Sequence, residues 1–401
     1  MTAGHHRDLR NPRLHVGPPR LAVALALAGL LAACQSGATT APSGASTPGG
    51  SVAASSTTTV VTVAITPAGC PPDTASIPAG PVTFKIVNNG ADGVTELELE
   101  KDGKILGEKE NLAPGLSGSF SLDLVPGEYV ISCPGAGTPD APLHVTAAGA
   151  AATTSTVTAQ LARATAAYAV YIKDQVGRLV TATQAFTDAV IAGDVARAKT
   201  LYGAARVFYE RIEPVAESFG DLDPAIDGRE DDASTAADFT GFHRLEHALW
   251  VTGSVTGMAP IATRLLADVK RLQVLVTGET YQPAQLANGA AELLDEISAS
   301  KITGEEERYS HLDLLDVQAN LDGSRGAYEL LKPALQDVDA TLVARIDAGF
   351  VTVQAALEPY RSGDSFVSYT TLSQAQTRAL AQVVDALAES MSLVATRLVG
   401  A

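Results

Sequence analysis

Basic side chains are scarce in this chain of 401 residues, which holds 28 lysine and arginine residues against 45 acidic ones. The formal net charge is −17, and part of the positive charge lies in the first 33 residues. Nucleic-acid binding requires a basic surface that neutralises phosphates, and the sequence indicates none. This composition argues against nucleic acid as a partner and favours cationic ligands.

Cysteine is rare as well, and the first of the 3 cysteines ends the tetrapeptide Leu31-Ala-Ala-Cys34. Four arginines and the apolar run 21–33 precede it. That run is too short to span a bilayer comfortably but suits a signal peptide. Because the tetrapeptide resembles a bacterial lipobox, residues 1–33 are predicted to be a lipoprotein signal peptide, and Cys34 the lipid-bearing N-terminus of a protein on the extracytoplasmic face of the cell membrane. The alternative is an ordinary signal peptide cut near Ala33.

Three segments with different compositions follow Cys34. Residues 34–59 are rich in Ser, Thr, Ala, Gly and Pro, a composition that cannot bury enough apolar surface to fold, and are predicted to be a disordered tether. Residues 60–147 alternate apolar and polar side chains between turn residues, which predicts antiparallel strands in an all-β sandwich. Residues 155–401 show helical spacing and predict a bundle of about seven or eight helices. Apart from the signal peptide, no run reaches the ~18 apolar residues that span a membrane.

The helical region contains two pairs of potential metal ligands. His243 and Glu246 are spaced to share one face of a helix, and Glu210 and Glu213 repeat that spacing before Pro214. Mixed oxygen and nitrogen ligands suit iron, zinc or manganese better than soft metals. Each pair alone is as consistent with a solvent-exposed helix face as with a metal site. An acidic loop is predicted between the pairs, and one of its carboxylates could complete the site: Asp221, Asp223, Asp227, Glu230, Asp231 or Asp232.

Several longer stretches of the chain are specific enough for comparison with known families: Ile105–Glu108, Asn111–Gly118, Tyr209–Asp227, Thr240–Glu246 with Leu249-Trp250, Lys301–Leu314 and Val317–Gly323. Together they resemble the EfeO family of iron-uptake lipoproteins and periplasmic proteins. The resemblance covers nearly the whole mature chain.

The resemblance implies a cupredoxin-like β domain followed by an imelysin-type helical domain. It also implies a non-enzymatic protein that captures ferrous or ferric iron outside the membrane and works with a membrane iron permease and a secreted haem peroxidase. Carried over residue by residue, the metal site of the helical domain would use His243, Glu246, Glu210, Glu213 and Asp227, joined by one carboxylate of the run Glu305–Glu307, for which Glu306 is chosen.

The β domain contains the remaining cysteines, Cys70 and Cys133. In an exported protein such a pair normally forms a disulfide, which is the favoured interpretation. The resemblance to cupredoxins offers a second metal site, for copper or zinc, in which these sulfurs join Glu96 or Glu98. A blue-copper centre needs two histidines, and His144 is the one histidine in this region, so the pattern departs from an electron-transfer cupredoxin.

A rival hypothesis comes from the motif His243-x-x-Glu246-His247. Read literally, it is the inverzincin arrangement, with two histidines as zinc ligands and Glu246 as the general base of a metallopeptidase. The motif is five residues long, whereas the iron-uptake resemblance extends over the mature chain. We therefore expect His247 to be a residue of the helix surface.

Overall fold

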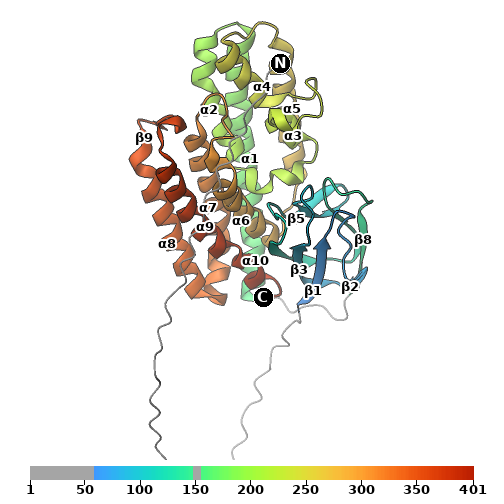
Figure 1. Cartoon of the computed structure of the whole chain (residues 1–401). Helices are drawn as coiled ribbons and strands as arrows, with labels where there is room; N and C mark the ends of the chain where they lie inside the picture. Colours follow the sequence, from blue (N-terminus) through green and yellow to red (C-terminus); the bar gives the residue numbers. More distant parts are fainter. Residues whose placement is uncertain (1–57, 148–154) are drawn as a thin grey trace, which may run out of the picture. The chain divides into compact units, whose positions relative to one another are not determined.

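The structure is a computed structural model that describes residues 58–147 and 155–401. A β domain precedes a larger helical domain (Figure 1). The predicted signal peptide, Cys34 and the tether up to residue 57 lie outside the described residues.

The β domain consists of two sheets, with strand orders β1-β3-β6 and β2-β8-β7-β4-β5. Alternate residues face the core, so Val82, Phe84 and Ile86 of β3 are fully buried, as are Leu97 and Leu99 of β4. The predicted all-β sandwich is confirmed. Its strands are β1 (Thr59–Ile65), β2 (Ser76–Pro78), β3 (Gly80–Asn88), β4 (Leu97–Lys101), β5 (Lys104–Lys109), β6 (Ser117–Leu124), β7 (Gly127–Ser132) and β8 (Ala141–Thr146).

The prediction of purely antiparallel strands is wrong for two pairs. β1 runs parallel to β3, and β2 runs parallel to β8. β4 and β5 form an antiparallel hairpin at the predicted turn, where Asp102 and Gly103 both have positive φ angles. A strand buries alternate residues in either direction of pairing, so the alternation could not distinguish the two cases.

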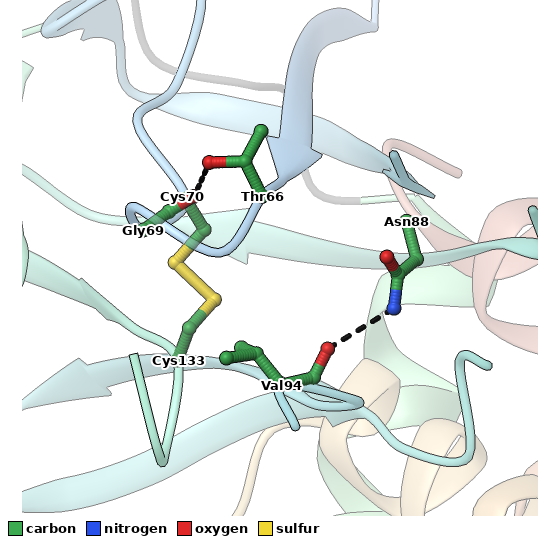
Figure 2. Close-up of a disulfide and its surroundings, with 6 residues drawn as sticks. All are labelled: Thr66, Gly69, Cys70, Asn88, Val94 and Cys133. Carbon is green, nitrogen blue, oxygen red and sulfur yellow. Dashed lines mark hydrogen bonds between the residues drawn. A yellow bond between two sulfur atoms is a disulfide. The ribbon is translucent and has the colours of Figure 1, made fainter. Parts of the chain in front are cut away.

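A disulfide between Cys70 and Cys133 joins the segment after β1 to the end of β7 (Figure 2). The two Cα atoms are 6.3 Å apart, and 63 residues separate the cysteines in the sequence. Nearby, the side-chain amide of Asn88 donates hydrogen bonds to the carbonyl oxygens of Ala91 and Val94, both at 3.0 Å. These contacts fix the loops at this end of the sandwich.

The helical domain contains ten α-helices within the described residues, more than predicted. The two short helices α3 and α10 account for the difference, because a helix of six residues repeats its apolar spacing too few times to be recognised. The helices are α1 (Thr156–Ile191), α2 (Val195–Glu210), α3 (Leu222–Asp227), α4 (Gly241–His247), α5 (Ala259–Gly278), α6 (Pro283–Ala299), α7 (Asp313–Val338), α8 (Ala340–Leu357), α9 (Gln374–Met391) and α10 (Leu393–Leu398).

Local sequence explains several helix ends. The side chain of Asp194 accepts a hydrogen bond from the backbone N–H of Arg197 at 3.0 Å and caps α2, after a left-handed turn at Gly193. Pro283 is the first residue of α6, where its missing N–H costs nothing. Pro214 lies in a short 3-10 helix, η1 (Glu213–Phe219), which follows the end of α2.

Two segments of the helical domain, Ala340–Tyr360 and Gln374–Leu398, are long and apolar enough to cross a membrane by length and composition. Neither is an uninterrupted apolar run, and both contain buried side chains such as Phe350 and Leu387 in the core of the domain. Core helices pass the same test, so these segments are weak evidence for membrane insertion.

Candidate metal site

A glycine allows α4 to begin directly against the end of α3. Gly241 has a φ of 72°, and a β-carbon at this position would overlap the carbonyl oxygen of Ile226. Residues other than glycine therefore do not fit without displacing α3. The close approach places the His243 ring of α4 beside Asp227, the last residue of α3.

The His243 side chain is 2% exposed, and its two ring nitrogens differ in their contacts. Nδ1 lies 3.1 Å from Oε2 of Glu246, within hydrogen-bonding distance. Nε2 has no hydrogen-bond partner. It faces Oδ1 of Asp227 at 3.6 Å and Oε1 of Glu306 at 3.7 Å, and these distances leave room for an ion that all three atoms could bind.

The charge on His243 depends on the surrounding carboxylates. Burial and the Arg206 guanidinium act to lower its pKa, but Glu246, Glu306 and Asp227 outweigh them and raise the pKa to about 9. The imidazole is therefore protonated near neutral pH. It must lose this proton before a metal ion can bind, because only the neutral ring offers a lone pair.

Glu246 is completely buried and held at both oxygens. Oε2 contacts His243, and Oε1 accepts hydrogen bonds from the backbone N–H groups of Tyr309 (3.0 Å) and Ser310 (2.7 Å). Burial acts to raise the pKa of Glu246, but His243 and the two N–H groups lower it below its usual value. Glu246 therefore fixes the orientation of the imidazole, as carboxylates commonly do beside metal-binding histidines.

The segment 305–310 brings two further carboxylates into the core, although consecutive acidic residues usually face solvent. Glu306 is 5% exposed and Glu307 is fully buried. The hydroxyl of Tyr202 donates a hydrogen bond to Glu307 at 2.9 Å. Burial acts to raise the pKa of Glu306, but Lys301, His243 and Arg206 hold it well below its usual range.

Two buried cations of the chain compensate much of this negative charge. The Lys301 ammonium contacts Glu213 and lies 3.8 Å from Glu306. Arg206 is fully buried in α2 and forms ion pairs with five carboxylates: Glu210, Asp227, Glu306, Glu307 and Asp316. Neither cation was predicted as part of the site, since nothing in the sequence distinguishes them from surface lysines and arginines.

The six residues predicted as metal ligands in the helical domain belong to three overlapping groups. Within each group, the possible ligand atoms lie within 4.8 Å of one another. The groups are Asp227, His243 and Glu306; His243, Glu246 and Glu307; and Glu210, Glu213 and Glu306.

Two expectations about the local structure are wrong. Glu210 ends α2 and Glu213 begins η1, so they do not share one helix face, and Asp227 lies in α3 rather than in a loop. Glu307 belongs to the run 305–307 from which Glu306 was chosen, and it is buried in this cluster too. Asp316 is a buried acidic residue of the cluster that sequence reasoning missed. Asp316 lies on α7, far along the chain from the motif.

His247 belongs to none of these groups. Its ring packs edge-on against that of Tyr309, with 5.0 Å between the ring centroids. It is half-buried rather than a plain surface residue as expected. Within the described residues, His243 is grouped with carboxylates and not with a second histidine, so the two-histidine zinc arrangement receives no support from the geometry.

A small cavity beside His243 is closed by polar contacts between two segments, 229–231 and 305–309. Arg229 is paired with Glu305 at 3.2 Å, and the Tyr309 hydroxyl donates a hydrogen bond to Glu230 at 2.6 Å. These side chains are partly exposed, whereas His243 is not. An ion from solvent would therefore reach His243 by passing between the segments 229–231 and 305–309.

In the β domain, Glu96, Glu98 and Glu108 form a separate carboxylate group. The sulfurs of Cys70 and Cys133 are bonded to each other and are not part of it. Burial is the main cause of a raised pKa at Glu98. This arrangement agrees with the favoured disulfide and differs from the alternative in which thiolates join Glu96 or Glu98.

Comparisons with known proteins agree with both domains. Residues 23–143 match the model of the cupredoxin-like domain, and residues 164–394 match the imelysin model. Proteins named iron uptake system component EfeO from Escherichia coli strain K12, Shigella flexneri and Shigella sonnei are each 43% identical to this chain over 336 residues. Each match covers 83% of this chain and 89% of the relative.

Proposed function

Because this chain belongs to the EfeO family of iron-uptake components, we propose that its helical domain binds iron outside the cytoplasmic membrane, at the cluster around His243. The proposed ligands are His243 Nε2, Asp227 and Glu306. Glu246 orients the ring, and Glu210 and Glu213 lie beside them. Iron here is cargo, which the protein passes to a membrane permease.

The observation that carries this proposal is the buried Nε2 atom of His243. A buried polar atom normally has a hydrogen-bond partner, and the absence of such a partner calls for an explanation. This atom instead faces two carboxylate oxygens at 3.6 and 3.7 Å. A metal ion bound by these three atoms would satisfy Nε2, the one of them that has no partner within the chain.

The chemistry of the donor set also favours iron. Carboxylates supply most of the ligands and one imidazole supplies nitrogen, a set that suits iron, manganese or zinc, whereas soft copper(I) prefers sulfur. The carboxylates of the cluster outnumber its cations Arg206, Lys301 and His243. A multivalent cation would restore the charge balance.

The remaining elements of the proposal rest on the predicted lipobox and on the family. A lipid on Cys34 would hold the protein at the outer face of the membrane, close to a permease. The family also implies a secreted haem peroxidase as a partner. Metal binding at Glu96 and Glu98 in the β domain stays a prediction, now with Glu108 as a third carboxylate and without sulfur ligands.

Equilibrium dialysis of the purified full chain with iron tests the proposal. Asp227→Asn removes one ligand charge with little change of shape, and we expect at least a ~10-fold loss of affinity. Asp174→Asn is the matched control, because Asp174 is exposed on α1, where it contacts Arg178 and Gln175, and belongs to none of the groups around His243. Equal affinity in wild type and Asp227→Asn would contradict the proposal.

A further inference from the structure

The carboxylate cluster of the helical domain has two halves that share Glu306. His243 and Asp227 belong to the first half, and Glu210 and Glu213 to the second. Each half contacts a buried cation: Arg206 pairs with Asp227 and Glu306 in the first, and the Lys301 ammonium lies among the carboxylates of the second. The halves differ because the first also contains Nε2 of His243, which has no hydrogen-bond partner.

Lys301 supplies this ammonium group. Its Nζ contacts Oε1 of Glu213 and lies 3.8 Å from Oε2 of both Glu306 and Glu296. The side chain is 6% exposed. Three carboxylates therefore surround one positive charge that has almost no access to water.

The other oxygens of the second half also have partners within the chain. The Asn320 side chain donates a hydrogen bond to Oε2 of Glu210 at 2.9 Å and another to Oε2 of Glu213. Oε1 of Glu210 accepts from Arg206. The carboxylate oxygens of Glu210 and Glu213 are thus satisfied without a metal ion, in contrast to His243 Nε2.

The backbone that bears Lys301 is held in place. The Tyr369 hydroxyl donates a hydrogen bond to the carbonyl oxygen of Ile302. Gly304 has a φ of 87°, and a β-carbon there would collide with the Tyr369 ring. Because the segment is pinned and the side chain buried, the ammonium group cannot move into solvent without local rearrangement.

An ion bound by Glu213 and Glu306 would lie where the Lys301 ammonium lies. Two positive charges a few ångströms apart repel strongly in a poorly solvated interior. Removing the lysine charge would instead leave uncompensated carboxylates that attract a hard cation.

We infer that Lys301 is the resident cation of the second half and limits the cluster to one metal ion, bound at the His243 half. This inference rests on the proposed function, because it assumes that the His243 half binds iron. Glu210 and Glu213 then serve Arg206 and Lys301 rather than the ion, and Lys301 sets the number of ions bound.

Anaerobic equilibrium dialysis with ferrous iron counts the ions on the full chain. We expect Lys301→Met to bind one more ferrous ion per chain than wild type. The matched control is Lys332→Met, since Lys332 is also paired with carboxylates, Glu329 and Asp347, but on the exposed part of α7. It should bind as many ions as wild type. An ion bound in the β domain would add the same number to wild type and to both variants, so it does not affect the differences between them.

The outcomes separate the inference from the proposed function. Equal numbers of ions on Lys301→Met and wild type would overturn the role of Lys301. His243→Ala should lose one ion relative to wild type, and no loss would overturn the proposed function whatever Lys301→Met does. A gain in Lys301→Met together with no loss in His243→Ala would therefore sustain the role of Lys301 and reject the iron site.

Glu213→Gln provides a second test that does not depend on the folding of Lys301→Met, and circular dichroism checks its fold. If Glu213 serves Lys301, iron affinity should stay within about 3-fold of wild type. A fall of ~10-fold or more, the size expected when a group that supports a metal is lost, would show that iron uses Glu213 and would overturn the inference.

Discussion

Replacement of His243 by alanine should weaken iron binding much more than replacement of its neighbour His247. His243 supplies an imidazole nitrogen that faces Asp227 and Glu306 and can donate a lone pair to a metal, whereas His247 packs against Tyr309 outside the cluster. Loss of an outer-shell partner of a metal site costs ~10–100-fold in affinity, so loss of a ligand should cost at least ~100-fold. This corresponds to about 3 kcal/mol of binding free energy.

Competition between the protein and a chromogenic ferrous chelator, in the absence of oxygen, measures the two variants. His247→Ala should bind iron within about 3-fold of wild type, a change smaller than the loss of an outer-shell partner. Circular dichroism controls for folding. Wild-type affinity in His243→Ala would refute the site. Equal losses in both variants would favour a two-histidine zinc site, and zinc-dependent peptide hydrolysis that His247→Ala abolishes would support the metallopeptidase.

Three further predictions concern the anchor, the β domain and pH. Cys34→Ser should release the protein from membranes into the soluble fraction, and unchanged sedimentation with membranes would contradict lipid attachment. Replacing Cys70 and Cys133 by serine should lower the free energy of unfolding by ~2–4 kcal/mol, measured by denaturant titration, whereas two reactive thiols in the unfolded, unreduced wild type would show that no disulfide forms. The metal-free protein should resist denaturant better near pH 6 than near pH 8.5. The pKa of His243 is raised to about 9, so its stabilising effect is fully present below the pKa of histidine in the unfolded chain and is lost as the pH rises. The pKa of Glu296 is raised, mainly by burial, to about 8, so Glu296 becomes a buried negative charge over the same pH interval. A midpoint that rises with pH would contradict this.

The sequence predicted features that depend on short-range patterns. Alternation in β3 and β4 placed Phe84 and Leu99 in the core, and Asp194 after Gly193 marked the start of α2. The spacing of His243 and Glu246 predicted their contact, because residues three apart meet on a helix.

Features that depend on distant contacts were not predictable from spacing. The parallel pairing of β1 with β3 does not change the alternation of apolar and polar residues, so the sequence pattern could not reveal it. Arg206 and Lys301 look like ordinary charged residues, and only the folded chain surrounds them with carboxylates from other segments. Glu306 was placed in the site by family resemblance, since tandem acidic residues by themselves favour solvent.

The central claim is that iron binds at His243 Nε2. Crystals of the full chain soaked with iron, with diffraction recorded above and below the iron absorption edge, test it most directly. Iron bound at His243 Nε2 should give an anomalous peak between His243, Asp227 and Glu306 and none at the Lys301 ammonium. A peak confined to Glu96, Glu98 and Glu108, or one between Glu210 and Glu213, would contradict it.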